Sequence, residues 1–391
     1  MTATAQPTED RAELRRELRS LIDTICADYP DAYWREVDEA RRYPEEFVDA
    51  LTGTGCLGAL VPEEFGGLGL GLGDASVLLE GINANGGNAG PVHAQLYTMG
   101  SLLRHGSREQ KRRYLPDVAS GRIRLQAFGI TEPTAGSDTT RIRTTATRTA
   151  DGYVVNGQKV FISRVQHSDL MLLLARTTPR SETSRRSDGL SLFLIDLREA
   201  DGVELRPLRT MVNHETNEVF FNNVRVPADA LIGEEGQGFR YVLDGMNAER
   251  ILIAAECVGD GRWFVRRASR YATEREVFDR PIGQNQGVQF PIAQAHVHIE
   301  AADLMRWKAA DLFDAGKPCG AEANMAKLLA SEASWEAADV ALQTHGGYGL
   351  TAEYDIERKF RETRLYRIAP ISSNLILSYV GQHVLGMPRS F

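Results

Sequence analysis

The segment GITEPTAGSD, residues 129–138, marks the point at which the pattern of the sequence changes from helical to β. Its glycines, its proline and its small hydroxyl-bearing residues favour turns. A turn of this composition exposes backbone N–H groups and hydroxyls to an anionic or heteroaromatic ligand. Composition alone favours an ordinary Pro/Gly turn. The segment therefore predicts a domain boundary near residue 124 and offers a first candidate binding loop.

The residues before this segment have the periodicity of helices. Apolar residues between Leu14 and Ile25 recur at spacings of four and three, which predicts an amphipathic helix that begins near Asp10. A glycine-rich stretch over residues 65–73 predicts a loop. We expect an all-helical first domain over residues 1–123.

Short β-prone runs follow the segment and predict a small β domain over residues 124–236. Gly, Asp, Asn and Pro separate these runs, and the charged, Ser-rich residues 176–188 are expected to form an exposed loop. The runs cover residues 153–155, 160–162, 171–175, 190–195 and 218–224.

Long helices are expected in the third domain, residues 237–391, because the helical period returns after Pro227. One helix begins at Gly238 and has an apolar stripe from Phe239 to Cys257. A later helix is predicted to bury Met325, Leu328, Leu329, Ala333, Ala337 and Val340.

Composition excludes several classes of protein. With 391 residues, 42% hydrophobic and 25% charged, the chain has the composition of a soluble globular protein, and its net charge of −8 argues against a nucleic-acid partner. No run approaches the roughly 18 apolar residues of a membrane helix, and residues 1–11 lack the pattern of a signal peptide. We therefore expect a cytoplasmic protein with no membrane partner. The four scattered cysteines, Cys26, Cys56, Cys257 and Cys319, are expected to be free thiols, mostly buried.

Familiar catalytic motifs are absent from the sequence. There is no phosphate-binding GxxxxGK[ST] loop and no GxSxG elbow, and His214-Glu215 lacks the second histidine of a zinc-binding HExxH helix, so no metal site is expected. A GxGxxA pattern at residues 347–352 follows a predicted helix rather than a strand, which argues against a dinucleotide-binding fold.

Glu249 occupies a position in the apolar stripe Phe239, Val242, Met246, Ile253 where an apolar residue is expected. Burial raises the pKa of a carboxyl group, which makes it a usable general base near neutral pH. The alternative is a structural carboxylate neutralised by a cation such as Arg250, and patterning alone favours that alternative.

Nine segments, GITEPTAGSD among them, occur in one order along the chain, and together they are far more specific than any single motif. With them, the chain from about Leu14 to Leu385 resembles the acyl-CoA dehydrogenase family of flavoenzymes. The resemblance implies a mainly α fold with a middle β domain: an N-terminal helical domain, a β-barrel-like middle domain and a C-terminal four-helix bundle. The segments are PEEFGG at 62–67, GITEPTAGSD at 129–138, NGQKVFIS at 156–163, VRVP at 224–227, GEEGQGF at 233–239, ERILIA at 249–254, RYATEREVF at 270–278, NQGVQF at 285–290 and QTHGGYG at 343–349.

The resemblance also implies FAD. Positions that match FAD contacts of the family are Phe128, Ile130, Thr131, Gly136, Ser137, Phe161, Ile162, Ser163, Ser372 and Asn374. Positions that match contacts with the FAD of a neighbouring subunit are Arg275, Gln286, Gln343, Gly346 and Gly347. An FAD shared between subunits implies an oligomer, in this family a homotetramer built as a dimer of dimers.

The implied substrate is an acyl-CoA thioester, with Ser137 and Arg250 at positions that contact it. A carboxylate removes the α-proton while the β-hydrogen leaves as hydride to flavin N5, which gives a trans-2-enoyl-CoA. The implied electron acceptor is an electron-transferring flavoprotein.

Pro370 is the main departure from the family pattern, because many members carry the catalytic glutamate at this position. A minority branch, with isovaleryl-CoA and long-chain acyl-CoA dehydrogenases, carries it on the helix just before the motif arginine, and here that residue is Glu249. Helix periodicity and resemblance therefore agree on Glu249 as the base.

Proline also removes a hydrogen-bond donor. Family members polarise the thioester carbonyl with a flavin hydroxyl and with the N–H at the usual base position, and proline has no N–H. The loss of such a donor costs on the order of 3 kcal/mol. We expect the register to slip so that Ala369 or Ile371 donates instead.

Two other functions fit the same resemblance: an oxygen-using flavin oxidase or monooxygenase, and a non-enzymatic DNA-associated flavoprotein. The basic run Arg358, Lys359, Arg361, Arg364 and Arg367 could suggest a DNA-binding surface. A solvated helix face with a Glu357–Arg361 pair explains it better at a net charge of −8. Residues 211–216 also depart from the family pattern.

Overall fold

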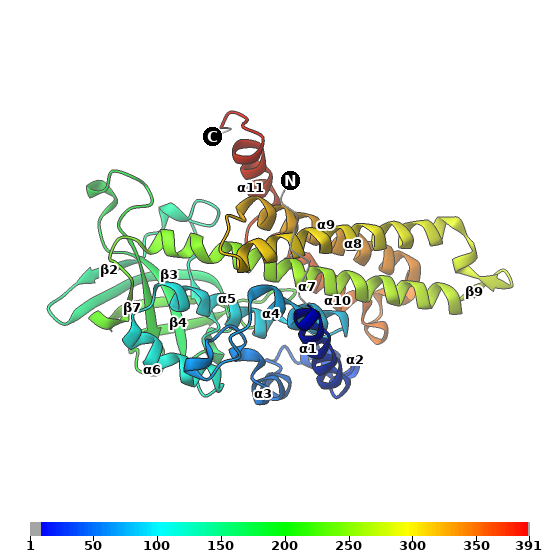
Figure 1. Ribbon diagram of the computed structural model, residues 1–391, viewed down its shortest axis with the longest axis horizontal. Helices are drawn as coiled ribbons and strands as arrows, with labels where there is room; N and C mark the ends of the chain where they lie inside the picture. Colours follow the sequence, from blue (N-terminus) through cyan, green and yellow to red (C-terminus); the bar gives the residue numbers. More distant parts are fainter. Residues whose placement is uncertain (1–8, 390–391) are drawn as a thin grey trace. The chain divides into compact units, whose positions relative to one another are not determined.

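The computed structural model describes residues 9–389, and these residues form two compact units (Figure 1). The helical unit comprises the chain up to Ala40, Gly71–Ala89 and the chain from Asn247 onward. The mixed unit comprises Arg41–Leu70 and Gly90–Met246. The packing therefore divides the N-terminal helices between the two units, although they are consecutive in the sequence.

The mixed unit combines three helices with the large sheet. The helices are α3 (Glu45–Gly53), α5 (Gly90–His105) and α6 (Arg108–Ala119). The strands are β1 (Ala127–Gly129), β2 (Thr145–Arg148), β3 (Gly152–Ser163), β4 (Leu170–Arg176), β5 (Leu190–Asp196), β6 (Val203–Pro207), β7 (Thr216–Pro227) and β8 (Leu231–Ile232).

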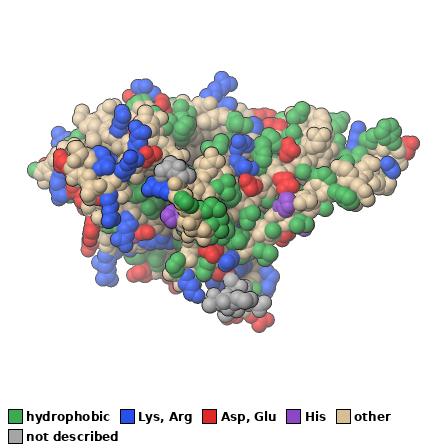
Figure 2. Space-filling model, turned by 90° about the horizontal axis from the view of Figure 1, so that it is seen from above, with side chains coloured by type: hydrophobic (Ala, Val, Ile, Leu, Met, Phe, Trp, Pro, Cys, Tyr) green, Lys and Arg blue, Asp and Glu red, His purple; other side chains and the backbone are tan. Residues whose placement is uncertain are grey.

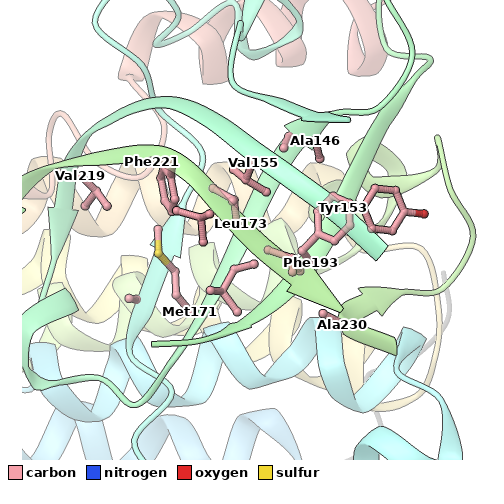
Figure 3. Close-up of a cluster of buried hydrophobic side chains, with 14 of the residues drawn as sticks. Ala146, Tyr153, Val155, Met171, Leu173, Phe193, Val219, Phe221 and Ala230 are labelled. Carbon is pink, nitrogen blue, oxygen red and sulfur yellow. The ribbon is translucent and has the colours of Figure 1, made fainter. Parts of the chain in front are cut away.

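The sheet has the strand order β6-β7-β3-β2-β4-β5-β8, and β1 pairs in parallel with β4. One face of it buries a cluster of aliphatic and aromatic side chains that includes Tyr153, Leu173, Phe193 and Phe221 (Figure 3). Alternation of buried and exposed residues along β3 and β7 produces this face.

One prediction about the strands needs correction. The β-prone runs 153–155 and 160–162 are a single strand, β3, whose pairing with β7 contains two register shifts. The polar residues between the runs suggest a break, but Lys159 is fully buried and ion-paired, so the strand continues through them.

The helical unit contains the long helices expected from residue 238 onward. Helix α7 begins within the residues of the mixed unit and continues into this one. The helices are α1 (Glu9–Ala27), α2 (Asp31–Glu39), α4 (Leu72–Ala84), α7 (Gly238–Glu274), α8 (Gln286–Asp314), α9 (Gly320–His345), α10 (Ile356–Leu365) and α11 (Ser373–Tyr379), with a short hairpin of β9 (Glu276–Val277) and β10 (Arg280–Pro281).

Helix α9 buries only part of the face predicted for it: Ala333 and Ala337 are buried, and Met325, Leu328 and Val340 are half-buried. Its buried residues are mainly alanine and serine, and this lets α8 pack closely against it. Leu329 is 42% exposed, whereas Lys327 is fully buried. The apolar period misleads here because the small residues, not the leucines, face the core.

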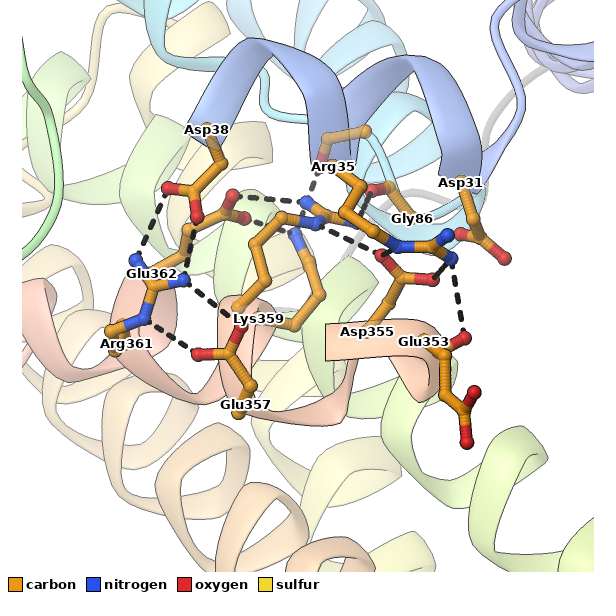
Figure 4. A network of polar contacts seen from close by, with 12 residues as sticks. Asp31, Arg35, Asp38, Gly86, Glu353, Asp355, Glu357, Lys359, Arg361 and Glu362 are labelled. Carbon is orange, nitrogen blue, oxygen red and sulfur yellow. Dashed lines mark hydrogen bonds and ion pairs between the residues drawn. The ribbon is translucent and has the colours of Figure 1, made fainter. Parts of the chain in front are cut away.

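The basic run on α10 is also not a solvated face. Arg358 and Lys359 are fully buried, while Arg361 pairs with Glu357 at 2.8 Å as expected. Figure 4 shows the network that α10 forms with α2 and with the turn after α4. The Lys359 ammonium lies 2.6 Å from Asp260 Oδ1 and 2.9 Å from Glu362 Oε2, and donates to the Gly87 carbonyl at 2.8 Å.

Three observations concern the described residues as a whole. All four cysteines are free and buried, which confirms that expectation. Within residues 9–389, each helix is too short or too polar to traverse a lipid bilayer, and no group of three or more His, Cys, Asp and Glu side chains is arranged to hold a metal ion.

Replacing Lys359 by Met should lower the free energy of unfolding by about 3–5 kcal/mol, because the buried Asp260 carboxylate loses its cation. Urea denaturation followed by circular dichroism measures the change. Arg270→Gln is the matched control, since it breaks an exposed ion pair with Glu274, and its effect should stay within about 0.5 kcal/mol. A similar decrease in the free energy of unfolding in both variants would contradict the prediction that breaking the buried ion pair is the more destabilising change.

Candidate active site

The loop after β1 is fixed to β3 from inside the mixed unit. Lys159 Nζ donates to the Ile130 carbonyl at 3.0 Å and lies 2.9 Å from Glu132 Oε1. The Val160 amide donates to the Thr131 carbonyl at 2.9 Å. Residues 130–132 of the segment identified first in the sequence are therefore held by neighbouring β3 residues.

Glu132 organises the same loop as an ionised carboxylate. It accepts hydrogen bonds from the amides of Arg143 and Thr144 at 2.6 and 2.9 Å. Burial raises the pKa of Glu132. The Lys159 charge and these hydrogen bonds lower that pKa by more than burial raises it, so the net shift is downward. Burial lowers the pKa of Lys159 to about 8 although Glu132 opposes this. The pair is charged at neutral pH.

The predicted flavin contacts on β3 differ in accessibility. Phe161 lies at a register shift, has a left-handed backbone (φ 59°) and is 65% exposed. Ile162 is buried in the sheet core, so its side chain is not available to a ligand. Ser163 is half-buried. A strained, exposed aromatic residue on a bulge is typical of a functional site.

Asn213 contacts the predicted flavin-site residue Ser163, and sequence reasoning did not single it out. Its Nδ2 donates to Ser163 Oγ at 2.6 Å and to Thr216 Oγ1 at 3.0 Å, and its Oδ1 accepts from Arg164 at 2.9 Å. It also has a left-handed backbone, with φ 55°. The sequence pointed to this residue only through the departure of residues 211–216 from the family pattern, and that departure did not assign a role to any single residue.

The remaining predicted residues of the loop offer open backbone. Phe128 and Thr131 are half-buried, and Gly136 and Ser137 are exposed. A Cβ placed on Gly136 would meet no atom within 4 Å, so there is room for a ligand beside this backbone. The Phe128 ring lies 5.8 Å from that of Tyr97, between ring centroids.

An arginine-lined cavity of about 780 Å³ begins next to Ser137, at Asp138. We call it the arginine cavity, and its cationic residues are Arg141, Arg143, Arg176, Arg180 and Arg186. Arg176 is buried and donates to the carbonyls of Thr140 and Asp188, while the other four arginines are exposed. Figure 2 shows Lys and Arg side chains grouped on one part of the molecular surface. This cavity is suited to a polyanion.

In the helical unit, Glu249 is 7% exposed on α7, as its position in the apolar stripe predicts. The neighbouring Arg250 donates to Asn247 Oδ1 at 2.9 Å, and its buried Nε meets no acceptor among residues 9–389. Burial lowers the pKa of Arg250, and the Glu249 charge partly opposes this. The structure therefore places a buried acid beside a cation with unused hydrogen-bonding capacity.

The loop after α10 lies near this pair. Lys327 Nζ donates to the Ile371 carbonyl at 2.8 Å. Burial lowers the pKa of Lys327 to about 8, and the charges of Arg250 and Glu249 also act on it. Ser372 caps α11 by accepting from the Leu375 amide, and Asn374 is exposed.

A second cavity, of about 550 Å³, is lined by some of the residues that the resemblance expects to contact the FAD of a neighbouring subunit. Arg275, Gly346 and Gly347 line it, with Tyr271 and His345 stacked at 4.2 Å. Gln286 and Gln343 are exposed and are not among its lining residues. The structure thus brings three of these five residues together.

These features fit a dinucleotide flavin and a polyanionic co-substrate. Exposed glycine backbone, hydroxyl groups and an outward-facing aromatic residue can hold a flavin, the arginine cavity can hold phosphates, and the buried Glu249 can take a proton.

Three family models match successive parts of the chain: the N-terminal domain of acyl-CoA dehydrogenase at residues 8–122, the middle domain at 127–224 and the C-terminal domain at 236–385. The chain belongs to the acyl-CoA dehydrogenase family, FAD-dependent oxidoreductases that act on CH–CH groups. The expected fold, with an N-terminal helical, a middle β and a C-terminal helical domain, is confirmed.

The similar proteins include acyl-CoA dehydrogenase FadE12 from Mycobacterium tuberculosis, 38% identical over 97% of this chain and 98% of that protein. A solved glutaryl-CoA dehydrogenase in complex with glutaryl-CoA is 30% identical, with a TM-score of 0.90 over 100% of this chain and 98% of that one. PigA with FAD and proline is 26% identical, with a TM-score of 0.89 over 98% and 99% of the two chains.

Replacing Asn213 by Gly should weaken FAD binding about 5- to 10-fold, because Ser163 loses the amide that orients it. Glycine keeps the left-handed backbone without strain. Asn223→Gly is the matched control, since Asn223 has φ 54° and its side chain bonds to the exposed Asn156, away from Ser163. Fluorescence titration of the apoprotein with FAD gives both affinities, and equal weakening in the two variants would contradict a role for Asn213 at the flavin.

Proposed function

We propose that the protein catalyses FAD-dependent α,β-dehydrogenation of an acyl-CoA thioester to the trans-2-enoyl-CoA, with Glu249 as the base. The observation that carries this proposal is the buried Glu249 beside Arg250 in a chain of this family. Because Pro370 occupies the usual base position, we assign the chain to the branch whose base lies on the helix before the motif arginine, with Glu249 in that role.

The chain's own residues supply the proton chemistry. Glu249 takes the α-proton, and the electron pair of the broken C–H bond moves toward the thioester carbonyl, which gains negative charge. Bound FAD supplies the acceptor for the β-hydride. Residues suited to hold FAD are Phe128, Thr131, Gly136, Phe161 and Ser163, with Arg275, Gly346 and Gly347 available to the FAD of a second subunit.

The arginine cavity is proposed to bind the phosphates of CoA. Its lining includes Asp138, which follows Ser137 in the sequence, and the resemblance places Ser137 at the substrate. Its four exposed arginines can pair with phosphate oxygens. In the helical unit, the buried Nε of Arg250, which meets no acceptor among residues 9–389, is proposed to hydrogen-bond the substrate.

A homotetramer and an electron-transferring flavoprotein acceptor complete the proposal. Three large apolar residues, seven positions apart on α8, are exposed: Phe290 (56%), Val297 (61%) and Leu304 (74%). Such a stripe is typical of a helix that packs against another subunit. The acceptor rests on the family resemblance alone.

Glu249→Gln should slow the loss of flavin absorbance on anaerobic mixing with an acyl-CoA by 10²–10⁴-fold, because the amide cannot accept the α-proton. Straight-chain, branched and aromatic acyl-CoAs form the substrate series. Glu274→Gln, an exposed residue of the same helix, is the control. Unchanged bleaching in Glu249→Gln, with FAD retained, would remove Glu249 from the mechanism.

The double variant Arg180→Gln/Arg186→Gln should raise KM for acyl-CoA about tenfold or more and leave kcat nearly unchanged, because phosphate binding is remote from the reacting carbons. Steady-state kinetics measures both constants. Arg185→Gln, in the same loop but outside the cavity lining, is the control. A pantetheine thioester without the CoA phosphates should show no difference among the variants, and an equal KM rise with that substrate would contradict the assignment.

A further inference from the structure

The loop between α10 and α11 has one peptide group that the fold leaves available next to Pro370. The amide of Ala369 donates to the Leu365 carbonyl at 3.0 Å, and the amide of Ile368 donates to the same carbonyl at 2.9 Å. Pro370 has no N–H. The amide of Ile371 meets no acceptor within the described part of the chain, 9–389, and is the first free amide after Ala369.

Ile371 is restrained on both sides. The ring of Pro370 limits the backbone before it. Behind it, the Ile371 carbonyl accepts the charge-assisted hydrogen bond from Lys327 at 2.8 Å. Because Lys327 is fully buried, water does not compete with the Ile371 carbonyl for its ammonium group. An amide held in this way is preorganised.

The same lysine connects Ile371 with the proposed catalytic pair. Lys327 lies on α9, Glu249 and Arg250 lie on α7, and Ile371 lies in the loop that follows α10, all within the helical unit. Both charges of the pair act on Lys327. An amide at this place is within the electrostatic environment of the base.

We propose that the Ile371 N–H is the protein donor to the thioester carbonyl, and that Lys327 is the positioning residue that holds it there. This inference rests on the proposed function and decides between the two donors expected from the sequence, since the Ala369 amide is already used. When Glu249 removes the α-proton, negative charge develops on the carbonyl oxygen, and the preorganised N–H stabilises it.

The test measures the carbonyl directly in the FAD-loaded enzyme. A 2-enoyl-CoA labelled with ¹³C at the thioester carbonyl is bound, and the shift of its infrared band relative to free ligand reports the hydrogen bonds to that oxygen. Ile371→Pro removes the N–H without breaking an internal hydrogen bond, and Lys327→Met removes the ammonium. Ile371→Ala, which keeps the N–H, and Lys308→Met, a half-exposed lysine of α8, are the controls.

Wild type and both controls should show the band at lower wavenumber on binding. The downward shift should be reduced in Ile371→Pro and in Lys327→Met, with kcat lowered about 10²–10³-fold in Ile371→Pro. An undiminished shift in Ile371→Pro overturns the donor, and an undiminished shift in Lys327→Met overturns the positioning role. Failure of wild type to bleach with any acyl-CoA counts instead against the proposed function, because the band shift needs no turnover.

Discussion

A fully buried ammonium group needs oxygen partners, and this requirement shapes the loops of both units. Three lysines with no exposed surface each donate to a backbone carbonyl outside the helices and strands: Lys159 to Ile130, Lys327 to Ile371 and Lys359 to Gly87. Loss of such a partner leaves an uncompensated charge in a low-dielectric interior. The positions of these loops are therefore tied to the stability of the core.

Two of the three loops carry candidate site residues. The loop with Ile130 contains the expected flavin contacts, and the loop with Ile371 lies near the proposed base. Glu132 completes the first arrangement as an ionised partner of Lys159. In each case the core holds a site loop through its backbone, so the adjacent side chains and amides are left for ligands.

Local patterns predicted the elements well because the period of apolar residues reports which face of a helix or strand is buried. The start of α7 at Gly238, the burial of Glu249 and the positions of β4, β5 and β7 all follow from the sequence. The buried lysines could not be predicted, since a charged residue in an alanine-rich or polar run has the pattern of a surface position. The contact of Asn213 with Ser163 likewise joins the loop before β7 to the end of β3, and no local period encodes such a contact.

Exposed arginines and buried lysines of this protein respond differently to dissolved salt. Exposed arginines of the arginine cavity act through solvent in which charges are screened over about 8 Å at physiological ionic strength. Lys327 has no contact with that solvent, so dissolved ions leave its bond to Ile371 unchanged. Ionic strength therefore acts on the capture of a polyanionic ligand and not on the alignment of the groups that would polarise it.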